Sequence, residues 1–209
     1  MKKNFLITAL LLLISGSVSA QTPEKNIFTI RGGVNLSDFS TDYTPTDTKV
    51  GFRVGATYER VLSRKLPLYL ETGLICTQTG CRDFDHDKIN GYSLQIPVMI
   101  NYKFRLSEQF ALYPSVGLYY AVGMGGHIKN GFRETLTYGD DGNLSRSDFG
   151  CKFAATLVWR RFLVTAGYEV GLNQLNQSEY AYSPTMPAHP AWDDELYHRN
   201  LFISVGYKF

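Results

Sequence analysis

The chain has 209 residues, enough for one domain, and its formal net charge is +2 at pH 7. This charge gives no strong field for recruiting nucleic acid or an acidic partner, so nucleic-acid binding is set aside. The 14 Tyr, 13 Phe and 19 Gly, with few stretches rich in helix-forming residues, favour strands separated by turns over helices.

Residues 1–20 have the three-part layout of a secretory signal peptide. Lys2 and Lys3 precede the apolar run Phe5–Ile14, and a Ser-Val-Ser-Ala segment ends the region. A membrane anchor needs about 20 apolar residues, and this run has about half that length. We therefore expect export through a cleaved signal peptide, which leaves residues 21–209 as one mature domain.

Downstream, eight segments alternate between an apolar face and a small or polar face, with the two-residue period of a strand. In one of them, Phe52 and Val54 fall on one face, and Arg53 and Gly55 fall on the other. Each segment is about ten residues long or slightly longer, the length that a tilted transmembrane strand needs. The segments are 28–36, 51–59, 68–74, 92–103, 110–123, 149–159, 162–171 and 200–209.

The volume of the side chains indicates which face points outward. The interior of an eight-stranded barrel is only just wide enough for side chains, and the apolar face carries Phe, Leu, Tyr and Trp, whereas the other is rich in Gly, Ser and Thr. We therefore expect the bulky face to meet lipid, although a soluble lipocalin-like ligand-binding barrel has the same period with the faces reversed. The predicted fold is all-β, an eight-stranded antiparallel up-and-down transmembrane β-barrel, closed because an open sheet edge is unstable in hydrocarbon.

The connections between the segments alternate in length, as in bacterial outer-membrane barrels with short periplasmic turns and longer outer loops. This pattern predicts a monomer in the cell outer membrane, in contact with its lipid and with both mature termini in the periplasm. Aromatic residues such as Trp159 and Phe162 cluster at the segment ends, as interfacial girdles require. The long connections are 39–49, 78–90, 126–147 and 174–198, and the short ones are 63–66, 105–109 and 160–161.

Several short motifs resemble those of the PorT-like outer-membrane β-barrel family. They are Gly33-Val34-Asn35-Leu36-Ser37, Gly51-Phe52-Arg53-Val54-Gly55, Gly73-Leu74-Ile75, Leu94-Gln95-Ile96-Pro97 and Gly206-Tyr207-Lys208-Phe209. The resemblance covers essentially the whole mature chain and implies the barrel fold. It also implies an accessory role in envelope assembly or protein secretion, with a partner complex beneath the membrane.

The end of the chain is similar to the aromatic-x-aromatic signal that the barrel assembly machinery reads. Tyr207 and Phe209 stand at the aromatic positions, and Ser204 stands where that signal often has Gly. The resemblance implies that the assembly machinery is a partner of this chain.

The small or polar face contains ionisable and amide side chains that should lie inside the barrel. Because charges in a narrow barrel must be paired or hydrated, we expect a network of salt bridges that fills the lumen. A proton or solute path is the alternative. The residues of this predicted lumen network are Arg31, Arg53, Glu71, Gln95, Lys152 and Glu169.

Two cysteines, Cys76 and Cys81, lie at the end of the third segment and the start of its loop. Their spacing and an oxidising compartment allow a loop-stapling disulfide, and unbridged thiols are the alternative. Cys151 shares parity with Phe149 and Phe153, so we interpret it as a small apolar residue on the lipid face.

The last long connection offers aromatic side chains for binding through the outer loops. Aromatic residues give a large contact area at low entropic cost, although they can equally pack on one another and on the barrel rim. The candidates are Tyr180, Tyr182, Trp192 and Tyr197.

Metal binding and catalysis are weaker readings of the loops. His86 lies among Asp83, Asp85 and Asp87, and the last loop holds His189 near Asp193, Asp194, Glu195 and His198, but neither has a known ligand spacing, so no metal or other cofactor is predicted. An outer-membrane enzyme acting on lipid or peptide would need a nucleophile beside a base. The available residues are Ser93, Ser145 and Ser147 with His86, His127 and His198. No spacing selects one triad, so the expected role is non-catalytic: interaction through the loops, or the accessory role.

Overall fold

The computed structural model describes residues 26–40, 47–63, 65–79, 81–82, 88–130, 133–136, 145–173 and 197–209. The predicted signal peptide lies outside these residues. Among the described residues, no helix is long and apolar enough to cross a membrane.

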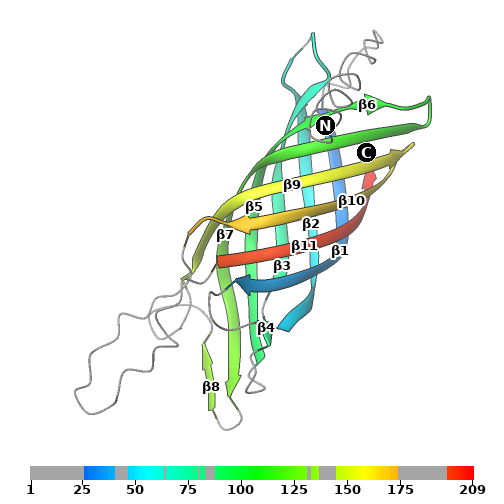
Figure 1. Ribbon diagram of the computed structural model, residues 1–209. Coiled ribbons are helices and arrows are strands. Elements are labelled where there is room, and N and C mark those ends of the chain that lie inside the picture. Colours follow the sequence, from blue (N-terminus) through cyan, green and yellow to red (C-terminus); the bar gives the residue numbers. More distant parts are fainter. Residues whose placement is uncertain are drawn as a thin grey trace, which may run out of the picture.

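The described part of the chain forms a closed antiparallel barrel of eight long strands (Figure 1). Each long strand pairs with the next along the chain, and the last pairs with the first. The long strands are β1 (Asn26–Ser40), β2 (Asp47–Val61), β3 (Leu68–Thr79), β5 (Lys88–Tyr102), β7 (Phe110–Asn130), β9 (Ser147–Trp159), β10 (Phe162–Gly171) and β11 (Tyr197–Lys208). Three short strands, β4 (Cys81–Arg82), β6 (Phe104–Arg105) and β8 (Arg133–Leu136), extend the sheet. The predicted all-β, eight-stranded barrel is confirmed.

The apolar face of the strands points outward and the polar face points inward. Phe52 is 48% exposed, whereas its neighbour Arg53 is 4% exposed, and the same alternation runs along the other long strands. A soluble lipocalin-like barrel would bury the apolar face instead, so that alternative is wrong. The exposed apolar surface is stable only in contact with lipid.

Aromatic side chains mark the limits of the apolar surface. On β9, Phe149 and Trp159 point outward about ten residues apart, which corresponds to a band roughly 25 Å tall for a strand tilted by about 40°. At the end with the short turns, neighbouring rings with centroids 5.0 to 6.5 Å apart form a continuous row across five strands. We call this row the turn-side aromatic belt; it comprises Phe110, Trp159, Phe162, Tyr207, Phe209 and Phe28.

At the opposite end, strand pairing continues past the barrel. β7 has 21 residues, about twice the length needed to cross a membrane, and its last part pairs with both β5 and β8. Residues 88–92, 123–130 and 133–136 therefore form a hairpin-like projection, which we call the loop-end extension (Figure 1). The sequence predicted a plain connection over 126–147, because the alternation fades where both faces of a strand meet water.

Candidate functional site

Inside the barrel, a first group of charged residues surrounds Glu169 on β10. This carboxylate is 1% exposed, and its Oε1 lies 2.7 Å from Lys152 Nζ and 3.1 Å from Arg53 Nη2. Asn200 donates a 2.6 Å hydrogen bond to the other oxygen. Gln95 Oε1 accepts hydrogen bonds from Lys152 at 3.1 Å and from Arg53 at 3.4 Å. These five residues, from five strands, form the loop-side cluster.

An aromatic ring completes the loop-side cluster. The Arg53 guanidinium carbon lies 3.8 Å from the ring centroid of Phe202, and Lys152 Nζ lies 4.8 Å from it. The ring reaches this position because Gly167 has no side chain: an added Cβ would lie 2.4 Å from the Phe202 ring. The π face offsets part of the positive charge that one carboxylate leaves unbalanced.

A second group lies nearer the short turns and contains two carboxylates. Glu71 forms a 3.1 Å ion pair with Arg31, and Glu59 forms a 2.8 Å ion pair with Lys103. The Asn101 amide links the two by donating hydrogen bonds to both carboxylates. These five residues form the turn-side cluster.

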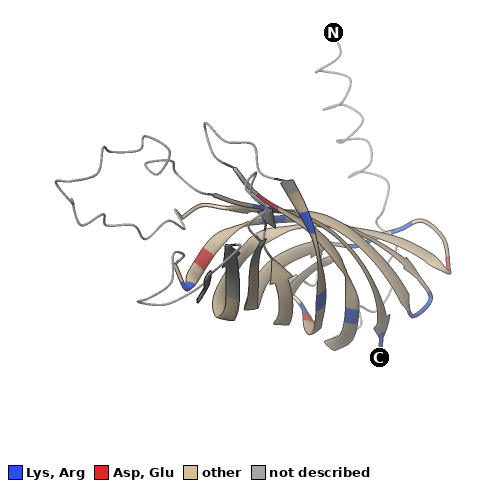
Figure 2. Ribbon diagram, turned by 90° about the horizontal axis from the view of Figure 1, so that it is seen from below, with Lys and Arg blue, Asp and Glu red and all other residues tan. Residues whose placement is uncertain are grey.

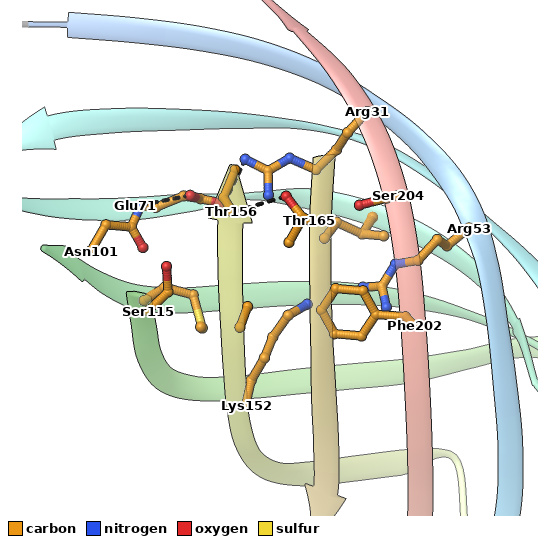
Figure 3. Close-up of a pocket in the computed structure, with 13 residues that line it drawn as sticks. Arg31, Arg53, Glu71, Asn101, Ser115, Lys152, Thr156, Thr165, Phe202 and Ser204 are labelled. Atoms are coloured by element: carbon orange, nitrogen blue, oxygen red, sulfur yellow. Dashed lines mark hydrogen bonds and ion pairs between the residues drawn. The ribbon is translucent and has the colours of Figure 1, made fainter. Parts of the chain in front are cut away.

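The two clusters leave little space between them. The cavity that separates them has a volume of about 20 Å³, and its lining includes Arg31, Glu71, Lys152 and Phe202 (Figure 3). A volume of this size holds about one water molecule. The described lumen between the two clusters is therefore a packed polar core.

A third polar group lies in the lumen on the side of the loops. The Tyr119 hydroxyl donates a 3.0 Å hydrogen bond to Asp148 Oδ2, and His198 Nδ1 lies 3.0 Å from the same oxygen. Tyr119 is 1% exposed, so this trio continues the packed polar interior.

The structure places all six residues of the predicted lumen network on the inner wall, divided between the two clusters. Arg53, Gln95, Lys152 and Glu169 belong to the loop-side cluster, and Arg31 and Glu71 belong to the turn-side cluster. Sequence reasoning missed Glu59, Asn101, Lys103, Asn200 and Phe202, and also the trio of Tyr119, Asp148 and His198. The inward parity of Glu59, Asn101, Lys103 and Asn200 was the signal that could have found those residues.

Of the two cysteines considered for a disulfide, Cys76 is a free thiol on the outer face of β3 in this structure. Its register partner on β2 is Val54, whereas Cys81 pairs with Thr48. Cys76 and Cys81 are five residues apart in an extended part of the chain, which corresponds to about 17 Å, and a disulfide needs Cα atoms within about 7 Å. Cys151 is also a free thiol and is partly buried.

Most loop candidates lie outside the described residues. Tyr180, Tyr182 and Trp192 are among these, and Tyr197 is the partly buried first residue of β11. Among the described residues, no group of three His, Cys, Asp or Glu side chains is placed to hold a metal ion.

The serine and histidine candidates for catalysis are only partly described. His86 and the His127 side chain lie outside the described part of the structure. His198 contacts Asp148 and Tyr119, and the Ser147 hydroxyl lies 3.5 Å from Ser145 Oγ. The described contacts of His198 are thus with an aspartate and a tyrosine.

Comparisons with known proteins agree with this fold. A major outer membrane protein from Thermus thermophilus is 12% identical, with a TM-score of 0.54 over 89% of this chain and 100% of that chain. OprG from Pseudomonas aeruginosa is 16% identical (TM-score 0.50, 91% and 99% covered), and Neisserial surface protein A is 12% identical (TM-score 0.50, 87% and 97% covered). No curated protein matches.

A family model supplies the assignment. The model described as outer membrane protein beta-barrel domain matches residues 19–177. The match includes β1 to β10, the whole turn-side cluster, and the loop-side cluster except Asn200 and Phe202 on β11. The chain therefore belongs to the outer membrane protein beta-barrel domain family.

Proposed function

We propose that the protein is a non-conducting, non-catalytic barrel that carries a binding surface on the outer side of the membrane. The observation that supports this proposal is the filled lumen: two buried charged clusters leave a cavity of only about 20 Å³ between them. A barrel that cannot pass a solute has to act through its ends.

The loop end has the larger surface for such contacts. The loop-end extension carries β7 and β8 beyond the apolar band. Tyr197 begins β11 at the same end, and Tyr180, Tyr182 and Trp192 precede it in the sequence. Aromatic residues of this kind are the usual anchors of protein interfaces.

Crosslinking on intact cells tests this surface. A membrane-impermeant crosslinker, followed by purification of the barrel, should capture an extracellular ligand with the wild type. Replacing Tyr180, Tyr182, Trp192 and Tyr197 by Ser should abolish the capture, and replacing all four by Phe should preserve it. If the Ser variant captured the extracellular ligand as well as the wild type does, the proposal would be refuted.

The same experiment separates the other functions. Recovery of inner-membrane or periplasmic secretion components, unaffected by the Ser variant, would establish the PorT-like accessory role instead. Hydrolysis of lipid or peptide in detergent, lost in His198→Ala, would establish an enzyme. A steady ionic current through the wild type in planar bilayers would contradict the non-conducting lumen.

A further inference from the structure

Basic side chains lie just beyond the turn-side aromatic belt. We call the group formed by Arg105, Arg160 and Arg161 the basic rim. Arg105 ends β6, and Arg160 and Arg161 form the turn between β9 and β10, with β7 lying between β6 and β9. All three arginines are exposed. Figure 2 shows Lys and Arg positions in blue on the strand ends and turns near the C-terminus. Among the described residues of this end, Glu108 is the one exposed acidic side chain.

Backbone hydrogen bonds hold the members of the basic rim together. The Arg160 amide donates to the Gln109 carbonyl at 3.0 Å, which ties the β9–β10 turn to the turn before β7. The Lys208 amide donates to the Arg161 carbonyl at 2.8 Å, which ties the same turn to β11. These bonds place the two adjoining turns, and the arginines that they carry, side by side on one sector of the barrel edge.

Arg160 has a backbone conformation that disfavours its own side chain. Its φ is 55°, and it is the one non-glycine residue with positive φ in the described part of the chain. In two-residue hairpin turns, Gly, Asn and Asp occupy such positions with less strain. An arginine held at a strained position indicates a use for its guanidinium.

The aromatic belt sets the depth of these charges in the membrane. Trp159 and Phe162 flank the turn, the Arg160 guanidinium lies 5.9 Å from the Trp159 ring centroid, and Arg161 Nη1 donates to the Tyr207 hydroxyl at 3.4 Å. Such belts mark the border between hydrocarbon and headgroups. The guanidinium groups therefore lie at the depth of lipid phosphates, which they bind with two parallel hydrogen bonds.

We propose that the basic rim binds the phosphate groups of anionic phospholipids in the leaflet next to the short turns. The aromatic belt holds the barrel at this depth, and the arginines select the headgroup charge. The site thus couples the position of the barrel in the membrane to the composition of the surrounding lipid.

Fluorescence of Trp159 tests the proposal. The chain has two tryptophans, so a Trp192→Phe background leaves Trp159 as the reporter beside the rim. The barrel is reconstituted in vesicles that contain brominated phosphatidylglycerol or brominated phosphatidylcholine, and quenching gives the relative binding of the two lipids. We expect a preference for phosphatidylglycerol of about fivefold for each engaged arginine.

The variants identify the residues that bind. Arg160→Asn combined with Arg161→Gln should lower the preference about 25-fold, fivefold for each arginine removed, and leave the contribution of Arg105. The urea midpoint should stay the same or rise, because Asn accepts the positive φ. Lys65→Gln is the matched control: it removes an exposed charge from the β2–β3 turn, four strands away on the opposite side of the barrel.

Four outcomes would overturn the proposal. They are no lipid preference in the wild type, an unchanged preference in the double variant, an equal loss in Lys65→Gln, and loss of the preference on adding excess inorganic phosphate. The third would indicate a diffuse field instead of a local site, and the fourth would indicate a site for free phosphate.

Discussion

Both charged clusters keep ionised side chains buried in the lumen, but the ratio of carboxylates to cations differs between them. In the loop-side cluster, Glu169 alone neutralises Arg53 and Lys152, whereas in the turn-side cluster two carboxylates meet two cations. The loop-side residues are also more deeply buried: the Arg53 side chain is 4% exposed and the Arg31 side chain is 14% exposed. The stability of the loop-side cluster therefore depends on one carboxylate, whereas that of the turn-side cluster depends on two.

The largest expected effect is that of Glu169→Gln. It leaves two buried cations without a counter-charge, so the free energy of unfolding should fall by about 3–5 kcal/mol. Urea unfolding in lipid vesicles, followed by tryptophan fluorescence and by gel mobility without boiling, measures this change. The exposed Glu108→Gln serves as the control and should leave the midpoint unchanged.

A smaller loss is expected for Glu71→Gln in the turn-side cluster. Glu59 remains there to pair with Lys103 and to accept from Asn101, and the partly exposed Arg31 can be hydrated. We expect a loss of about 1–2 kcal/mol in the same urea assay. A loss as large as that of Glu169→Gln would show that the two clusters do not differ as their charge balance suggests.

The aromatic rings sharpen the same comparison. Phe202 is the ring that Arg53 and Lys152 share, whereas Lys103 lies over both Tyr69 and Tyr113. Phe202→Leu should therefore cost about 2 kcal/mol, and Tyr69→Leu about 1 kcal/mol, because Tyr113 remains beneath Lys103. Equal losses in urea unfolding would mean that side-chain volume decides the effect and cation–π contact does not.

The smallest expected effect is that of reducing agent. Because Cys76 and Cys151 are free thiols, dithiothreitol should change neither the urea midpoint nor the gel mobility of the folded barrel. Mass spectrometry of peptides from the unreduced protein should find Cys76 unbridged. A disulfide-linked Cys76 peptide would contradict the strand register around it.

Side-chain parity made the barrel predictable from the sequence. Phe52 outside and Arg53 inside follow from the two-residue period and from the small volume of an eight-stranded lumen. The loop-end extension was not predictable in this way, since strands that leave the membrane can pair through their backbones without alternating. The short strand β4, which places Cys81 away from Cys76, likewise pairs through its backbone and has no alternating pattern that would predict it.

The partners within each cluster could not be predicted from the sequence. Arg53 and Glu169 are 116 positions apart, and their contact depends on how each strand is shifted along its neighbours. Phe202 and Asn101 carry no charge, so nothing in their residue type marked them as members of a charged cluster. Parity places a side chain inside the barrel, but the register decides which side chain it meets.

The pairing of β1 with β11, from Thr29 opposite Lys208 to Ser40 opposite Tyr197, has a consequence for biogenesis. The first strand, β1, and the last, β11, are neighbours in the barrel. A sheet that lacks β11 therefore has two unpaired edges. Such edges are intolerable in hydrocarbon and prone to aggregation in water. The barrel is therefore stable in the membrane only when β11 has paired with β1.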